Sequence, residues 1–199
     1  MPESTLPSTK DFPSAARYPM KKSSAADVTA LLGACCFFLS ALEYMVPKPL
    51  PFMRLGIANL PILLATDLLP LPWFLALALV KVVGMSVISG SLFSYIAVFS
   101  LAGTLTAALT MRGGRKLFGR HVSAVGISIL GAMVSNAVQI AIASVLVFGE
   151  AARLIAPPFL IMGLVTGTLL GLFAEAFAGK SRWYERAKAL LGGTEEGRA

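Results

Sequence analysis

The sequence places few polar side chains inside its apolar stretches, and these few could do chemistry. Lys81 lies within such a stretch, about 12 Å from either end at ~1.5 Å per residue. A lysine there can bind a ligand carboxylate or phosphate, pair with Glu43 or Asp67, or extend its amine to a membrane surface. Because Asp67 lies only three residues before Pro70, a direct pair with Lys81 would be strained.

A second polar group lies on a later apolar segment. Ser135 and Gln139 are four residues apart, so a helix would place them on one face with Gly131, and Asn136 lies beside them. Amides within a membrane can hydrogen-bond a ligand or a neighbouring helix. The sequence leaves these two alternatives for Asn136 and Gln139 open.

The stretch from Pro47 to Pro61 is a third candidate. Its alternating prolines prevent a regular helix and favour an extended chain. Asn59 could cap a helix that begins at Leu60. Irregular backbone at membrane depth is tolerated only beside a cavity or in contact with protein. We therefore expect this stretch, with Arg54 and Asn59, to be either the wall of a binding site or a plain proline kink.

The composition places these residues in a membrane. Of 199 residues 56% are hydrophobic and 14% charged, and the mean hydropathy is +0.77. Soluble globular chains are about 45–50% apolar and about 25% charged, so a disordered chain or a disulfide scaffold is excluded. The sequence predicts an all-α membrane protein of six transmembrane helices. The six apolar segments are 26–46, 55–69, 73–89, 93–111, 122–148 and 155–178. The second and third are short against the ~20 residues that a crossing requires.

The basic residues indicate the orientation. Three regions, before the first segment, after the fourth and after the last, hold 13 of the 17 lysines and arginines. Six crossings put all three on one side, and the positive-inside rule makes that side, and both termini, cytoplasmic. The same distribution argues against a nucleic-acid-binding surface. We expect a flexible tail at 1–24, a membrane domain at 25–180 and a C-terminal tail at 181–199, in the cell membrane.

Motifs for independent catalysis are missing from the sequence. It has no glycine-rich phosphate-binding loop, no paired aspartates for Mg²⁺, no Ser/His/Asp set and no metal-ligand cluster. The adjacent Cys35 and Cys36 make a poor disulfide and are expected to be packing residues. We predict a protein that is not an enzyme and needs no metal or cofactor.

Two helices carry small residues at intervals of four. These are Ala26, Ala30 and Ala34 in the first and Gly163, Gly167 and Gly171 in the last. Small residues allow helices to approach closely in lipid. Internal packing is the favoured interpretation for the glycines, whereas for the alanines packing and contact with another subunit are equally favoured.

Several stretches resemble the Gx transporter family, also labelled heptaprenyl diphosphate synthase component I. The resemblance covers about residues 26–178 and departs at Ser135 and Val138, where the family has His and Gly. The matching stretches are Arg54–Pro61, Lys81 with Gly90–Ser94, Phe99–Gly103, Gly126–Ala132, Ser135–Gln139 and Gly163–Gly167.

This family is similar in turn to the substrate-binding S components of energy-coupling factor transporters. Those six-helix proteins bind a vitamin or similar small molecule near the external side, while a transmembrane component and ATPases supply energy. The resemblance implies docking through the alanine face. We expect the substrate contacts to come from Arg54, Asn59, Lys81, Asn136 and Gln139. The alternatives are a non-catalytic membrane component of heptaprenyl or polyprenyl diphosphate synthesis, with an isoprenoid- or quinone-related ligand, and a structural scaffold.

Overall fold

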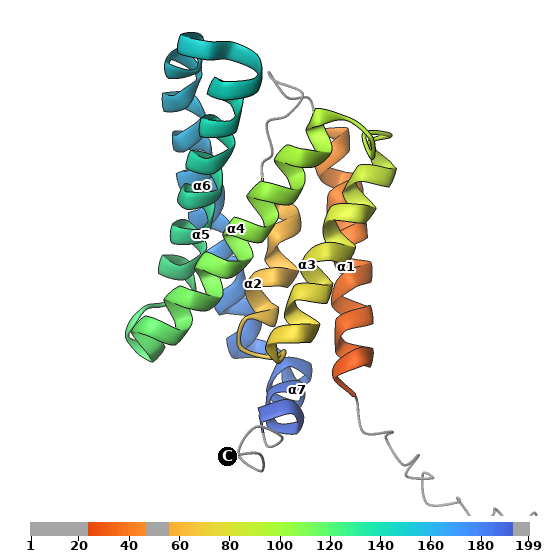
Figure 1. Ribbon diagram of the computed structural model, residues 1–199. Helices are drawn as coiled ribbons and strands as arrows, with labels where there is room; N and C mark the ends of the chain where they lie inside the picture. The colour runs from red at the N-terminus through yellow and green to blue at the C-terminus, as the bar shows by residue number, and fades with distance from the viewer. Residues whose placement is uncertain (1–23, 47–55, 193–199) are drawn as a thin grey trace, which may run out of the picture.

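The computed structural model describes residues 24–46 and 56–192, which form helices and no strand (Figure 1). Most of the predicted N-terminal tail therefore lies outside the described residues. The long helices are α1 (Ala25–Met45), α3 (Leu71–Ile88), α4 (Tyr95–Phe118), α5 (Ala124–Ala143) and α6 (Ala152–Lys180). The short ones are η1 (Ile57–Asn59), α2 (Leu60–Ala65), η2 (Gly119–His121), the π-helical η3 (Ser144–Phe148), η4 (Gly149–Ala151) and α7 (Arg182–Gly192).

Local sequence explains where the helices begin. Ser24 caps α1 in a capping box with Asp27, and Ser94 and Ser123 accept hydrogen bonds from the first turns of α4 and α5. Proline in the first turn starts both α2 and α3, where the missing N–H costs nothing. The helix starts therefore follow directly from residue type.

Four stretches of the described chain are long and apolar enough to cross a membrane: α1, α3, α4 and the continuous run Ala124–Lys180. That run contains α5 and α6, which fold back on each other (Figure 1). Large apolar side chains, among them Phe38, Val87 and Leu154, are exposed on the outside of the bundle, as contact with lipid requires. The prediction of an all-α membrane protein is confirmed.

The second predicted segment does not form a full crossing helix. The helices η1 and α2 have three and six residues, about 14 Å together. Helix α2 lies in the half of the bundle nearer α7, and the start of α1 lies at that same end (Figure 1). The described residues do not test six crossings or cytoplasmic termini, and both stay predictions.

The glycines of α6 pack against α5. A methyl group on Gly171 would overlap Val125, one on Gly163 would overlap Asn136, and one on Gly167 would lie 3.1 Å from the Ile129 Cα. The interpretation of this stripe as internal packing is confirmed. The alanine face of α1, in contrast, is exposed; it comprises Ala26, Ala30 and Ala34.

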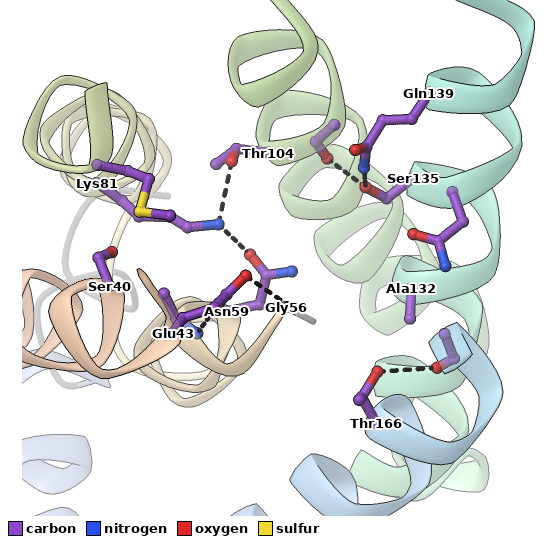
Figure 2. Close-up of a pocket in the computed structure, with 15 residues that line it drawn as sticks. Ser40, Glu43, Gly56, Asn59, Lys81, Thr104, Ala132, Ser135, Gln139 and Thr166 are labelled. Carbon is purple, nitrogen blue, oxygen red and sulfur yellow. Dashed lines mark hydrogen bonds between the residues drawn. The ribbon is translucent and has the colours of Figure 1, made fainter. Parts of the chain in front are cut away.

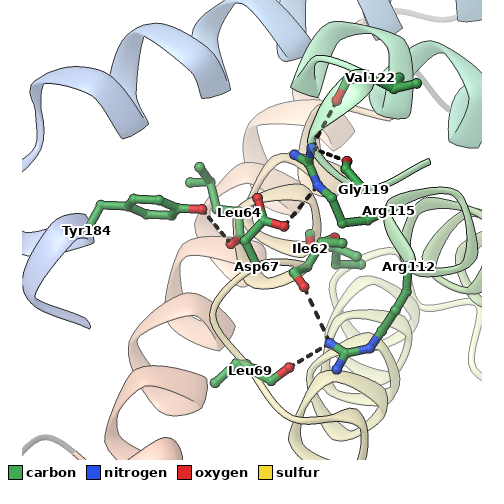
Figure 3. Close-up of polar contacts among 10 residues, drawn as sticks. Ile62, Leu64, Asp67, Leu69, Arg112, Arg115, Gly119, Val122 and Tyr184 are labelled. Carbon is green, nitrogen blue, oxygen red and sulfur yellow. Dashed lines mark hydrogen bonds and ion pairs between the residues drawn. The ribbon is translucent and has the colours of Figure 1, made fainter. Parts of the chain in front are cut away.

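A polar cluster closes the end of the bundle near α7 (Figure 3). Arg115 pairs with Asp67 at 2.9 Å and donates to the Val122 carbonyl. Arg112 donates to the Leu69 carbonyl at 2.6 Å. The hydroxyl of buried Tyr184 lies 3.4 Å from the Leu64 carbonyl, so it connects α7 to α2. The predicted C-terminal tail thus begins with a helix that packs on the bundle.

Candidate functional site

A pocket lies inside the bundle, walled by η1 and the five long helices (Figure 2). It holds about 460 Å³ of empty space, counted with the part that opens to the outside. Glu43, near the end of α1, and Gln139, near the end of α5, place it toward the end of the bundle away from α7. Its polar lining consists of Ser40, Glu43, Asn59, Lys81, Thr104, Ser135, Asn136, Gln139 and Thr166.

Four of the five predicted binding residues line this one pocket, although three different elements carry them along the chain. They are Asn59, Lys81, Asn136 and Gln139. The fifth, Arg54, lies outside the described residues. The structure thus brings the predicted set together, and a ligand role for it stays a prediction.

The amine of Lys81 points into the bundle. Lys81 is 4% exposed, and its Nζ donates to Thr104 Oγ1 at 3.0 Å and to Asn59 Oδ1 (Figure 2). The alternative in which Lys81 reaches a membrane surface is therefore wrong. Asp67 does not meet Lys81, because it pairs with Arg115 at the end of the bundle near α7.

Asn59 does not cap α2 with its side chain, which corrects the expectation from sequence. An N-cap side chain accepts from the second or third residue of the helix, and here the second is Pro61, which has no N–H. The backbone of Asn59 is also helical, with φ −83° and ψ −11°, instead of extended. Its side chain is consequently available to Lys81.

Glu43 holds the irregular start of this segment. Its two carboxylate oxygens accept from the backbone N–H groups of Gly56 and Ala58, each at 3.2 Å. Gly56 adopts φ +80°, a conformation that glycine reaches without strain. From sequence, Glu43 was expected only as a partner for Lys81. An acidic residue inside a membrane segment, upstream of a Gly in a helix-breaking stretch, was the available signal.

The polar side chains of α5 connect it to both neighbouring helices. Ser135 Oγ donates to the Gly103 carbonyl in α4 at 2.8 Å, and Asn136 Nδ2 donates to the Phe159 carbonyl in α6 at 2.9 Å. Gln139 Nε2 donates to Ser135 Oγ at 3.1 Å. Asn136 therefore has the interhelical bond that one alternative expected, while it also lines the pocket.

Sequence reasoning missed three hydroxyl residues of the pocket, Ser40, Thr104 and Thr166. Thr166 donates to the Met162 carbonyl one turn earlier, as Ser and Thr commonly do in membrane helices. Because that bond is open to any helical Ser or Thr, residue type alone does not mark the ones beside a cavity.

An apolar outside and a polar interior pocket define an integral membrane helical bundle with an internal site. The chain belongs to the heptaprenyl diphosphate synthase component I family, whose model matches residues 32–177. The matched region includes most of α1 and every other helix that lines the pocket. No curated protein and no solved structure is significantly similar to the chain.

Proposed function

We propose that this protein is the membrane-embedded substrate-binding subunit of a small-molecule uptake system. The observation that supports this most is the polar pocket in the interior of the bundle. Polar side chains within a membrane are costly, so a cluster of them is a functional-site hypothesis by default. Two of the lining residues, Glu43 and Lys81, are ionisable and almost fully buried.

The depth of α2 suggests a path for the ligand. Helix α2 fills only the half of the bundle nearer α7 (Figure 1). The pocket is lined by Ala58 and Asn59, which directly precede α2, so it lies beyond the start of this helix, toward the opposite end. In the orientation predicted from the basic residues that end is external. The ligand enters there and meets Lys81 and Asn59 on one side and Gln139 on the other.

Release to the inside requires an energised partner, since the sequence has no phosphate-binding loop. We propose a transmembrane component with ATPases, as the similarity to S components implies. The exposed alanine face of α1, defined by Ala26, Ala30 and Ala34, is the proposed contact, because small side chains permit close helix packing in lipid.

The family name favours a second candidate, a non-catalytic membrane component of heptaprenyl or polyprenyl diphosphate synthesis. In that role the chain would recruit a soluble prenyl transferase to the membrane. Neither candidate assigns a catalytic residue to this chain.

Purification from native membranes in mild detergent separates the two. We expect a transmembrane component and ATPases to co-purify with the wild type, and to be lost with Ala30→Leu, because a bulky side chain separates the helices. The matched control is Ala137→Leu, which enlarges an exposed alanine on α5. Co-purification of a soluble prenyl transferase instead, unaffected by Ala30→Leu, would replace the first candidate with the second.

A further inference from the structure

The amide of Gln139 has one possible orientation. Ser135 uses its only hydroxyl hydrogen on the Gly103 carbonyl, so Ser135 Oγ can only accept from Gln139. The Nε2 end of the amide must therefore face Ser135. The carbonyl end, Oε1, is left as an acceptor that has no partner among the described residues, although Gln139 is only 3% exposed.

Other pocket groups have hydrogen-bonding capacity to spare. Ser40 is fully buried on α1, and its hydroxyl also has no partner among the described residues. Asn59 accepts from Lys81 through Oδ1, so its Nδ2 is a donor, and Figure 2 shows that end of the amide pointing away from Lys81. The pocket thus offers an acceptor at Gln139, a donor at Asn59 and a hydroxyl at Ser40. Leaving a buried polar group unsatisfied is costly, so Gln139 Oε1 and Ser40 Oγ indicate a ligand that completes them, and half-buried Asn59 offers it a donor.

The charge of the pocket limits which ligands fit. Its described lining contains one cationic side chain, Lys81, and one anionic, Glu43, so the two balance. A diphosphate is normally bound by several basic groups or through Mg²⁺ on carboxylates. No group of three His, Cys, Asp or Glu side chains among residues 24–46 and 56–192 could hold a metal ion. Among the described lining residues, the apolar side chains are those of Ala58, Met85 and Ala132, which offer little surface to a polyprenyl chain.

We propose that the pocket binds a small, uncharged compound that presents both a donor and an acceptor, such as a cyclic amide, an imide or a nucleobase-like ring, and not an isoprenoid diphosphate. This inference rests on the proposed binding function and specifies its substrate class. The compound donates an N–H to Gln139 Oε1 and accepts from Asn59 Nδ2.

Thermal unfolding of the full chain in detergent tests this with two sets of probes. The neutral set is uracil, nicotinamide and lumichrome, and the anionic set is inorganic pyrophosphate, isopentenyl diphosphate and heptaprenyl diphosphate. We expect at least one neutral probe to raise the Tm in a saturable manner and no anion to do so. Stabilisation by an anion, with none by the neutral probes, would overturn the inference and leave a binding function standing.

Single substitutions test whether Gln139 is responsible for the binding of the stabilising probe. Gln139→Leu should weaken the binding of the stabilising probe about five- to ten-fold, the effect of one lost hydrogen bond. The Tm without probe should change little, because the substitution removes the unsatisfied Oε1 acceptor together with the bond to Ser135. The matched control is Ser100→Ala, which removes a buried hydroxyl that likewise has no partner in the part of the chain that the structure describes and is not among the pocket's described lining. It should leave probe binding unchanged.

Failure of the variant to fold and failure of every probe to bind also have defined consequences for the proposal. If Gln139→Leu does not fold, Ser40→Ala is the second variant. It should weaken the binding of the same probe. Unchanged probe binding in a folded Gln139→Leu protein would overturn the inference. If no probe binds while the wild type retains a compound in native mass spectrometry, the inference fails and the binding function stands. If no compound is retained either, both fail.

Discussion

Lys81 connects two walls of the pocket, because its amine donates to Asn59 at the start of α2 and to Thr104 in α4. Hydrogen bonds from a charged group contribute about 1.5–3 kcal/mol each. Lys81→Met should therefore lower the free energy of unfolding by about 2–3 kcal/mol and weaken the binding of any compound that stabilises the wild type. Thermal unfolding with and without that compound measures both effects.

The exposed Lys116 on α4 provides the control. Lys116→Met changes the charge equally and should leave stability and binding near the wild type. If Lys81→Met were as stable as the wild type and bound the compound equally well, Lys81 would belong neither to the site nor to the packing of the bundle.

Gly163 gives the Asn136 amide room between α5 and α6, since a methyl group on Gly163 would overlap Asn136 Nδ2. Asn136 would then lose its bond to the Phe159 carbonyl or push the helices apart. We expect Gly163→Ala to destabilise the protein by about 1–3 kcal/mol, as overpacking does, in chemical or thermal unfolding.

Gly179 lies on the same helix, and a methyl group there would meet no atom within 4 Å. Gly179→Ala should be neutral or stabilising, by up to about 1 kcal/mol, from helix propensity alone. Equal destabilisation by both substitutions would show that helix α6 is sensitive to any change of glycine and not to the contact with Asn136.

At this scale the sequence predicts the amides and the lysine well, since each is conspicuous in an apolar segment. Prediction from sequence fails where a second residue or a neighbouring helix changes the hydrogen bonds that a residue's type and position would predict. Asn59 has the type and position of a cap, but Pro61 removes one of the two N–H groups that a cap can accept from, and the helical backbone of Asn59 is not that of a cap. The orientation of the Gln139 amide depends on which acceptor the Ser135 hydroxyl donates to. That acceptor is the Gly103 carbonyl in α4, so the position of α4 decides the orientation.

Helix α7 attaches to the bundle through Tyr184, whose ring packs edge-on against Phe177 at 6.5 Å between centroids. Burial, with the nearby Asp67 carboxylate, raises the pKa of Tyr184 to about 12. An unfolded tyrosine loses its proton near pH 10. Between these values the unfolded chain binds fewer protons than the folded one, so the free energy of unfolding falls as the pH rises.

Tyr184→Phe should remove this contribution. We expect the wild type to lose stability between pH 10 and 12, by up to about 1.4 kcal/mol per pH unit from this group, and the variant to lose less. Unfolding at a series of pH values in detergent measures the difference. Tyr95→Phe, at a half-exposed ring, controls for tyrosines in general. Parallel pH profiles for the wild type and Tyr184→Phe would contradict the assignment.

The helix boundaries were predictable to within a few residues where the pattern is long and apolar: 26–46 was expected for α1 and 73–89 for α3. Helix α7 was not anticipated, because its charges resemble those of a solvated tail. Among the residues of α7 whose burial is described, only Tyr184 and Ala187 are buried, and they were visible as a pair three residues apart. Helix α2 begins at a proline, Pro61 in its first turn, and Pro70, five residues after its end at Ala65, limits how far it could continue.

The bundle is apolar outside, and its interior combines an apolar core with a polar pocket. The start of α1 and helix α7 lie at the same end of the bundle (Figure 1). Composition alone predicted the membrane class. The side of the membrane depends on the basic residues, which favour a cytoplasmic α7. The convergence of Asn59, Lys81, Asn136 and Gln139 on one pocket could not be derived from sequence, because helix rotation decides which face points inward.

Cysteine labelling tests the orientation. In a Cys35→Ala/Cys36→Ala background, Phe93→Cys and Glu150→Cys report on one end of the bundle, whereas Lys116→Cys and Lys188→Cys report on the other. An impermeant maleimide added to intact cells should label the first pair and not the second. The reverse pattern would put α7 on the external side. Labelling at only one of the positions 93 and 150 would mean that the two positions lie on opposite sides of the membrane, so that α4 and α5 do not form a pair of crossings.

The central claim is that the interior pocket binds a small molecule. Native mass spectrometry of the wild type, released from mild detergent, tests it most directly. We predict one retained compound per chain, with a mass of a few hundred daltons, and its loss in Lys81→Met but not in Lys116→Met. A wild-type spectrum that contains only the bare chain and lipids, or an adduct that Lys81→Met retains in full, would contradict the account.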